Sequence, residues 1–374
     1  MMTRQSLALL TFLFSIIFVN CTNTDNFDLD EELEIIDEEQ LEENNDPEES
    51  EEENNNSEEE EEENEDSEGN EDGEDNQGNE HTVDGTTPLL TNVRNYIFGH
   101  SLILHATDSD ETTVPYWLGA LSTSAGYNYA GDGQYGFLPG HANLPPTAQW
   151  GVDGVQGLWN SEAGTPFSNA DFNTILLTAG NFVQYQGSDV PYDFENNVDN
   201  VTPISATLDI VDWVVQEEPE VTVYIYENWP DMDGLINSFP PTDSEFDFYN
   251  QHTMGEFHDW WLDYHDAIIS NRPEINVKMI PVGPIMSKLF TDTPLSGIPV
   301  TDLYEDGAPH GRATLYFLAS LITYSAMYGV QPPANFTIPE TVHALVHENY
   351  TSTLNIIWEE LQNFNTDSGN SRVW

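Results

Sequence analysis

Short apolar runs of strand length recur along the chain between residues 96 and 282. They cover residues 96–98, 174–178, 221–226 and 277–282, and a further strand is expected over residues 128–135. The four apolar runs are rich in β-branched or aromatic residues and are apolar on both faces. This is the pattern of strands in a parallel sheet that helices cover on both sides.

Amphipathic patterns of helical spacing lie between these runs. Residues 203–216 begin with proline and repeat apolar side chains every three or four positions. Residues 258–270 show a similar amphipathic spacing. Further helices are expected from Thr112 or Thr113, from Arg312 to a glycine stop at Gly329, and from Pro339 onward. The alternation of strand and helix predicts an α/β fold, a three-layer sandwich with a mainly parallel central sheet.

The N-terminal region has a different character. Arg4 precedes an apolar stretch that ends at Cys21, which is the order of a secretory signal peptide. Cys21 is the only cysteine, so an intrachain disulfide is excluded, and its position is similar to that of the acylated first residue of a bacterial lipoprotein. An ordinary cleaved signal is the alternative. We expect a signal peptide over residues 1–21, a disordered acidic linker over 22–90 and one globular domain over 91–374.

Acidic residues dominate the charge of the chain. Of its 68 Asp and Glu, 31 lie between residues 22 and 80, where there is no Lys or Arg and little to bury, so this segment is expected to be an extended tether. The remaining 37 stand against six Lys and Arg in residues 81–374. Nucleic acid and anionic lipid are therefore excluded as partners, and membrane contact is expected only through an N-terminal lipid.

Polar residues follow three of the predicted strands. In a parallel α/β sheet the carboxyl ends of the strands meet at one edge, where ligands bind. Ser101 follows the first strand in Gly-His-Ser, and a serine on such a turn can act as a nucleophile. Asn181 follows the strand over 174–178 and could donate to an oxyanion. Asp306 and His310 precede the helix from Arg312, where the carboxylate could orient the imidazole toward the serine.

These residues together resemble the SGNH (GDSL-type) hydrolases. The four blocks of that family correspond to GHS at 99–101, a glycine in YAGDGQYGF, Gly180-Asn181, and Asp306 with His310. The resemblance implies a flavodoxin-like three-layer fold and a Ser-His-Asp esterase. Ser101 would attack the carbonyl, His310 would carry the proton, and Asp306 would hold the imidazole. The oxyanion would bind the Ser101 N–H, the Gly136 N–H and the Asn181 side chain, and no metal or organic cofactor is needed.

Three departures from the family pattern leave alternatives open. His100 stands where an aspartate is usual between the glycine and the serine. Three residues separate the aspartate and histidine of the last block where two are usual, so Asp302 could replace Asp306 as the orienting acid. The second-block glycine could be Gly131 or Gly133 rather than Gly136, which we prefer because it ends the expected strand over 128–135.

Aromatic and histidine residues outside these blocks suggest further contacts. Trp229 follows the strand over 221–226 and could stack on a sugar or line an acyl pocket, and Trp150 and Trp159 could form a lid or a substrate wall. His343 and His347 are four apart on a helix, but no third metal ligand is evident. A second histidine-containing helix face, over residues 258–266, is expected to be solvated.

The features together predict an extracytoplasmic serine esterase. The resemblance is closest to Bacteroidetes members linked to polysaccharides, and an acidic run behind a lipidated cysteine resembles the surface-export signal of that group. The expected substrate is an acylated carbohydrate, with a lipid or small ester as an alternative, and the expected location is the outer membrane or the cell surface. The alternative from another class is a non-catalytic glycan-binding lipoprotein with a degenerate hydrolase fold.

Overall fold

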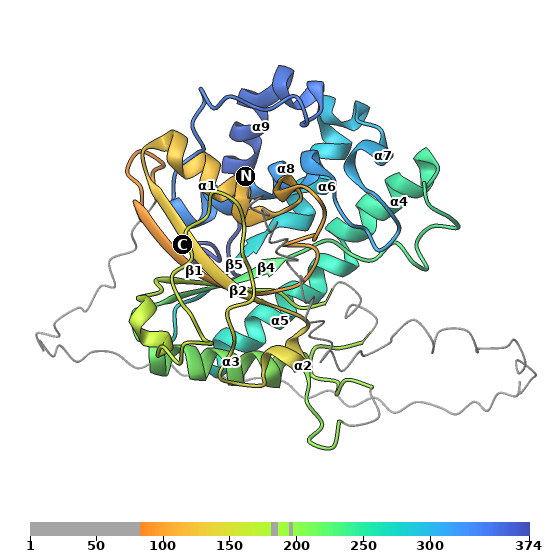
Figure 1. Ribbon diagram of the computed structural model, residues 1–374. Coiled ribbons are helices and arrows are strands. Elements are labelled where there is room, and N and C mark those ends of the chain that lie inside the picture. The colour runs from red at the N-terminus through yellow and green to blue at the C-terminus, as the bar shows by residue number, and fades with distance from the viewer. Residues whose placement is uncertain (1–82, 181–185, 194–196) are drawn as a thin grey trace, which may run out of the picture. The chain divides into compact units, whose positions relative to one another are not determined.

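The computed structural model describes residues 83–180, 186–193 and 197–374, in which five strands form one sheet (Figure 1). The strand order is β2-β1-β3-β4-β5, and every neighbouring pair is parallel. The strands are β1 (Asn92–Gly99), β2 (Asn128–Tyr135), β3 (Thr174–Leu177), β4 (Thr222–Glu227) and β5 (Val277–Pro281). The predictions for the signal peptide, Cys21 and the linker up to residue 82, and for Asn181, fall outside the described residues.

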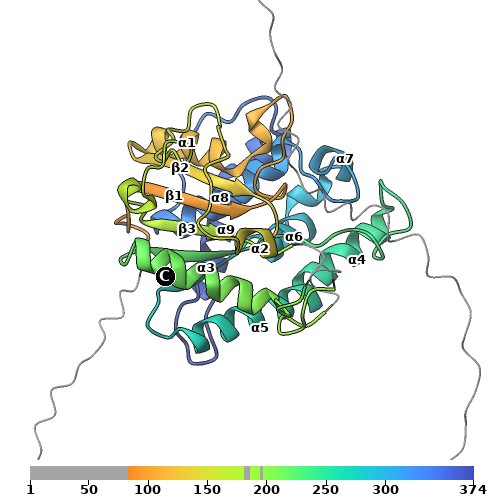
Figure 2. The ribbon, with the colours of Figure 1, turned by 60° about the horizontal axis from the view of Figure 1, so that its bottom comes forward.

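Helices cover both faces of this sheet, so the predicted three-layer α/β sandwich is confirmed (Figures 1 and 2). One face carries α1 (Val114–Ala125), α6 (Val282–Asp292), α8 (Ala313–Tyr328) and α9 (Ala344–Asn363), with α4 (Asp243–Met254) and α7 (Val300–Leu303) beyond them. The other face carries α2 (Leu138–His141), α3 (Pro203–Glu217) and α5 (Glu256–Asn271).

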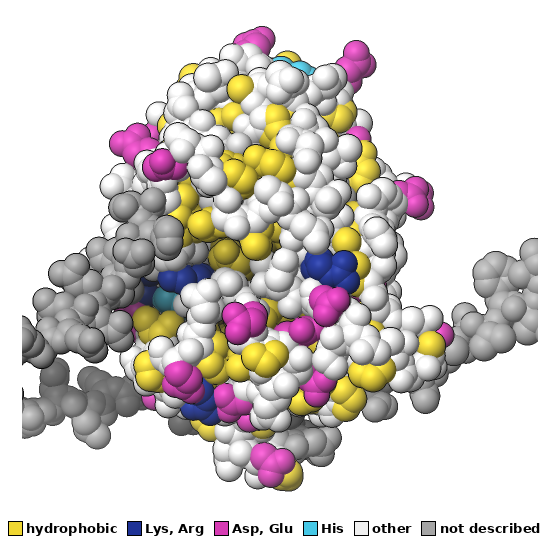
Figure 3. Space-filling model, turned by 90° about the vertical axis from the view of Figure 1, so that its left-hand side faces the viewer, with side chains coloured by type: hydrophobic (Ala, Val, Ile, Leu, Met, Phe, Trp, Pro, Cys, Tyr) yellow, Lys and Arg dark blue, Asp and Glu magenta, His cyan; other side chains and the backbone are white. Residues whose placement is uncertain are grey.

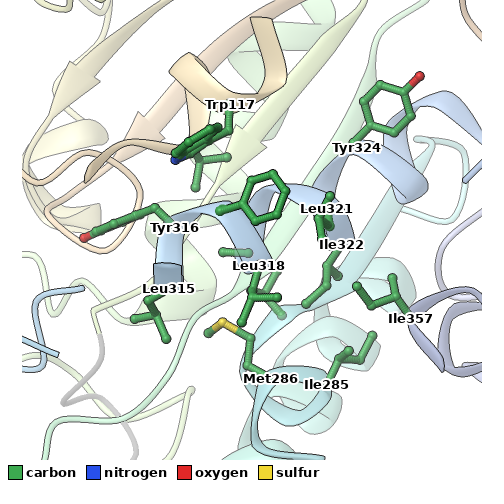
Figure 4. Close-up of a cluster of buried hydrophobic side chains, with 14 of the residues drawn as sticks. Trp117, Ile285, Met286, Leu315, Tyr316, Leu318, Leu321, Ile322, Tyr324 and Ile357 are labelled. Carbon is green, nitrogen blue, oxygen red and sulfur yellow. The ribbon is translucent and has the colours of Figure 1, made fainter. Parts of the chain in front are cut away.

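Helix α8 is the centre of the larger core. Its residues from Thr314 to Tyr328 are all buried, which is the behaviour of a helix that is apolar all round. Figure 4 shows its side chains between Trp117 of α1 on one side and Ile285 and Met286 of α6 on the other. This helix follows directly on the loop that carries His310, so the core fixes one end of that loop.

The ends of the helices follow local sequence signals. Thr113 caps α1 by accepting a hydrogen bond from the Tyr116 N–H, and the helix stops at Gly126 in a left-handed conformation. Helix α8 likewise ends at Gly329, whose φ is 66°, as predicted. The predicted start of the last helix was wrong. Helix α9 begins at Ala344 and not at Pro339, because the His343 side chain caps it.

The longer helices α4 and α6 were not predicted, nor were the short helices α2 and α7. Val282, expected at the end of a strand, instead begins α6 directly after β5. Residues 243–254 form α4, whose Thr242 and Glu245 make a reciprocal capping box. Across the described part of the chain, none of the helices combines the length and the apolar character needed to span a bilayer.

The surface is acidic, and the basic groups on it are already engaged. Figure 3 shows one face, over which Asp and Glu side chains are scattered while Lys and Arg gather in few places. Each Lys and Arg of the described residues has a partner: the groups are Arg94, Arg272, Lys278, Lys288, Arg312 and Arg372. Arg272, Lys288 and Arg372 pair with carboxylates, and the large excess of Asp and Glu over Lys and Arg in residues 81–374 disfavours a polyanion.

The two histidines of α5 correct an expectation, since both are largely buried, whereas Asp259 and Asp263 of the same helix are exposed. His265 is 1% exposed and contacts Arg372 through its ring nitrogen at 2.8 Å. His258 bonds the carboxylate of the fully buried Glu227 at 2.7 Å. Burial raises the pKa of Glu227 to about 7, although His258 opposes this change. These histidines therefore join buried polar networks.

Candidate active site

The turn after β1 presents Ser101 at the carboxyl edge of the sheet. The carbonyl oxygen of His100 accepts hydrogen bonds from the N–H groups of Ile103 and Leu104 at 2.9 and 3.1 Å, which closes the turn. Leu102 and Ile103 are fully buried, whereas Ser101 is partly exposed. The buried side chains of Leu102 and Ile103 thus fix the backbone of the turn, and the hydroxyl of Ser101 stays accessible.

His100 replaces the expected aspartate without disturbing this turn. Its Nε2 lies 3.0 Å from the carbonyl oxygen of Ala179, which can only accept, so Nε2 carries the proton. Its Nδ1 then accepts from the Leu102 N–H at 3.3 Å, as a carboxylate oxygen could. Burial lowers the pKa of His100 to about 4. The neutral imidazole therefore supports the nucleophile turn.

A tyrosine from α8 holds the backbone of the nucleophile. The hydroxyl of Tyr316 donates to the carbonyl oxygen of Ser101 at 2.5 Å. Figure 4 shows this hydroxyl directed away from the other labelled side chains of the core. The buried helix α8 is thereby tied directly to Ser101.

Ser101, His310 and Asp306 form a continuous hydrogen-bonded relay. The Ser101 Oγ lies 3.0 Å from Nε2 of His310, and Nδ1 of His310 lies 2.8 Å from Oδ2 of Asp306. An ionised carboxylate can only accept, so Nδ1–H donates to Asp306 and Nε2 is left to accept the serine proton. The arrangement has the nucleophile, base and orienting acid that acyl transfer requires.

The loop that carries Asp306 and His310 is fixed by its own hydrogen bonds. Oδ1 of Asp306 accepts from the N–H groups of Ala308 and His310 at 3.1 and 3.0 Å, which accommodates the three-residue spacing. The Glu305 N–H donates to the carbonyl oxygen of His310 at 2.7 Å. Burial acts to raise the pKa of Asp306, but the bonds from His310 and Ala308 outweigh it and lower the pKa.

Of the two candidate acids, the structure brings Asp306 and not Asp302 to the imidazole of His310. Asp302 lies on α7, and its Oδ2 is 3.9 Å from Nε2 of His343. That contact is at the limit of an ion pair, and Asp302 is half exposed. Asp302 therefore belongs to the neighbouring surface.

Trp229 requires a correction. Its side chain is 1% exposed and packs edge-on against the ring of Tyr316. Its Nε1–H donates to the carbonyl oxygen of Pro309 at 2.9 Å. The ring is buried beneath the catalytic loop and cannot stack on a substrate, so its contact with the site runs through the residue before His310.

The oxyanion prediction is only partly supported by the geometry. Gly136 is wrong as a donor, because its N–H already donates to the carbonyl oxygen of Gly99 at 2.9 Å. The Gly131 N–H is likewise taken, by the carbonyl oxygen of Gln156. The Ser101 N–H has no acceptor among the described residues and stays available. Asn181 lies outside those residues, so its role stays a prediction.

Trp150 and Trp159, which were predicted to form a lid or a substrate wall, pack against strand β2 and the smaller core. A Cβ placed at Gly133 would lie 2.7 Å from the Trp150 ring, so that ring rests on the glycine-rich strand β2. Trp159 packs against Tyr96 and Phe167 of the smaller core, and its ring N–H donates to the carbonyl oxygen of Thr165. Gly133 of the second block thus makes room for the ring of Trp150.

Three residues near the relay were not predicted from the sequence. They are Tyr316, described above, and the pair His105 and Glu305. The imidazole of His105 stacks on that of His310, with centroids 4.3 Å apart and planes 9° apart. His105 follows Ser101 by four positions and Glu305 directly precedes Asp306, so proximity to the two motifs was the one signal available.

Comparison with known proteins adds little to this geometry. No family model and no curated protein matches the chain. A solved structure described as a lipolytic protein of the G-D-S-L family, from Desulfitobacterium hafniense DCB-2, is similar. The two share 11% sequence identity, the match covers 62% of this chain and 98% of the other, and the TM-score is 0.32. A likeness at this level supports no conclusion, so the proposal below depends on the site.

The described residues contain no cluster of three or more His, Cys, Asp or Glu side chains placed to hold a metal ion. His343 caps α9 by accepting from the Leu345 N–H, and His347 contacts the carbonyl oxygens of Pro339 and Val342. The ring hydrogen bonds of the two histidines therefore stay within their own helix and its approach.

Proposed function

We propose that this protein is a serine ester hydrolase that removes acyl or acetyl groups from a carbohydrate. The observation that carries the proposal is the relay from Ser101 through His310 to Asp306. Ser101 attacks the ester carbonyl as His310 takes its proton, and His310 then protonates the leaving alcohol. Water releases the acyl group from Ser101 in a second step that uses the same base. The Ser101 N–H is one donor to the oxyanion.

The choice of a neutral, acetylated polysaccharide rests on charge and on the N-terminal region. Acidic residues far outnumber basic ones, and half of the described Lys and Arg pair with carboxylates, which disfavours polyanionic substrates. A signal peptide that ends at a lipidated Cys21 would place the enzyme at the cell surface, with the acidic segment as its tether. Palmitate labelling of the wild type and of Cys21→Ala tests this anchor: equal labelling contradicts it.

A glycan-binding protein without activity is the alternative, and no contact of the site favours it. The two sequence features behind it were His100 and the three-residue spacing. The neutral His100 ring bonds Leu102 and Ala179, and the N–H groups of Ala308 and His310 both donate to Asp306. Neither feature separates the members of the relay.

Hydrolysis of 4-nitrophenyl acetate by the wild type, Ser101→Ala and Ser352→Ala tests the proposal. Ser352 is an exposed serine of α9 and serves as the matched control. We expect Ser101→Ala to lose the activity above background and Ser352→Ala to keep it. Acetate release from acetylated xylan and acetylated glucomannan then tests the substrate. A wild type as inactive as Ser101→Ala on all three substrates contradicts the esterase.

A further inference from the structure

Two imidazoles lie face to face at the site, and each is held by one of two consecutive carboxylates. His310 bonds Asp306 at 2.8 Å, while Nε2 of His105 bonds Oε2 of Glu305 at 3.2 Å. The rings are parallel within 9° at a centroid separation of 4.3 Å. The side chains of His105 and His310 are only 19% and 23% exposed. One face of the His310 ring is therefore covered by a second ring.

We propose that His105 is a positioning residue for His310, an inference that rests on the proposed esterase function. The relay works only while the His310 ring stays in the plane that joins Asp306 to Ser101. The carboxylate of Asp306 is 47% exposed, so water competes for it and the single Nδ1 bond holds the ring weakly. A stacked ring hinders rotation of the imidazole out of that plane.

His105 itself is mounted on a fixed turn. Its backbone N–H donates to the carbonyl oxygen of Thr112 at 3.1 Å, and its carbonyl oxygen accepts from the hydroxyl of Thr112 at 2.8 Å. Thr113, which follows Thr112, forms an antiparallel bridge with Leu104 and caps α1. The His105 ring is therefore supported from the side of the nucleophile turn, while the His310 ring is carried by the loop before α8.

Glu305 has a secondary role in this arrangement. Its side chain is 45% exposed, so its pairing with His105 contributes little as an ion pair. Its bond to Nε2 of His105 helps to orient that ring, and a neutral acceptor would do the same. Glu305→Gln is for this reason a matched variant that removes charge and keeps a hydrogen-bond acceptor.

The kinetic test compares His105→Ala, His105→Phe and Glu305→Gln with the wild type on 4-nitrophenyl acetate. Because a misplaced base affects the chemical step, we expect His105→Ala to lower kcat about tenfold or more with KM within about twofold. His105→Phe keeps a flat ring and should stay within about threefold of the wild type, as should Glu305→Gln. A wild-type kcat in His105→Ala, a loss confined to KM, or equal losses in the Ala and Phe variants would overturn the inference.

A second measurement does not depend on ester hydrolysis. The proton on Nδ1 of His310 should give a downfield NMR resonance in a Ser101→Ala background, assigned by its loss in Asp306→Asn. Adding His105→Ala should broaden or remove this resonance, while His105→Phe should keep it. An unchanged resonance with His105→Ala overturns the positioning role whether or not the protein is an esterase. A wild type inactive on every ester with the expected NMR result contradicts only the esterase.

Discussion

The hydroxyl of Ser101 lies 3.0 Å from Nε2 of His310, although the two residues are 209 positions apart in the chain. Ser101 is held by the turn after β1, and His310 by the loop before α8. The contact therefore depends on the parallel sheet and on the packing of α8 over it. The predictions below separate the groups that act in the relay from those that support it.

Asp306→Asn and Asp302→Asn form a matched pair on neighbouring segments. Asp306 accepts from Nδ1–H of His310, so its replacement removes the charge that stabilises the imidazolium and allows the wrong tautomer. We expect kcat to fall by about 10²- to 10⁴-fold. Asp302→Asn should remain within about threefold of the wild type, because Asp302 contacts His343 instead. In steady-state kinetics, a loss in Asp302→Asn together with wild-type activity in Asp306→Asn would instead assign the orienting role to Asp302.

Trp229→Phe tests whether this ring supports the catalytic loop. The substitution keeps an aromatic ring but leaves the carbonyl oxygen of Pro309 without its donor. We expect a loss of about 1–3 kcal/mol in the free energy of unfolding, measured with urea. The kinetic effect should appear in kcat. A rise in KM alone would favour substrate contact, against the burial of the ring.

Tyr316→Phe and Tyr324→Phe remove two hydroxyls from the same helix. The Tyr316 hydroxyl bonds the carbonyl oxygen of Ser101, whereas the buried Tyr324 hydroxyl has no partner among the described residues. We expect Tyr316→Phe to lower kcat about tenfold through a shift of the nucleophile. Tyr324→Phe should keep kcat and leave the unfolding free energy unchanged or higher, since it removes an unsatisfied group. Equal kcat values in the two variants would show that the Tyr316 bond does not position Ser101.

His100→Asn tests the neutral state of the histidine below the nucleophile. Burial lowers the pKa of His100 from 6.5 to about 4, so the unfolded chain binds more protons between these values. Stability should therefore fall as the pH falls from about 6.5 to about 4. His100→Asn should reduce this loss of unfolding free energy by about 3 kcal/mol at most, measured by urea unfolding between about pH 6.5 and pH 4.

The asparagine can still accept from the Leu102 N–H in the place of Nδ1, and Asn228 still donates to the carbonyl oxygen of Ala179, so the fold should persist. Burial also lowers the pKa values of His141 and His265 to about 4. In His100→Asn, these two histidines should therefore still make the unfolding free energy fall as the pH falls. If the unfolding free energy changes with pH equally in the wild type and in His100→Asn, the fold does not hold His100 neutral.

The strand-end rule located Ser101, which follows β1, because parallel strands place their carboxyl ends together. Asp306 and His310 precede α8 and are separated from β5 by α6 and α7, so the resemblance to a known family was needed to assign them. The rule does not say which backbone N–H groups remain free. Gly136 was misassigned because its bond to Gly99 extends the pairing of β1 with β2 by one residue, a detail of register.

Contacts between side chains of different loops could not be read from the sequence. Trp229 has the same position after a strand whether its ring faces solvent or core, and only the packing of Tyr316 decides between them. The stacking of His105 on His310 likewise depends on how closely the turn after β1 approaches the loop before α8. Capping signals, by contrast, are local, and the ends of α1 and α8 at Gly126 and Gly329 followed them.

Strand β1 lies between β2 and β3, and both pairings are parallel, so each requires a crossover connection. Such long-range pairings form slowly in comparison with local helices. The loop with His310 can reach Ser101 only after α8 has docked on this sheet. During refolding, helical circular dichroism should return before hydrolytic activity, which makes activity a sensitive reporter that assembly of the sandwich is complete.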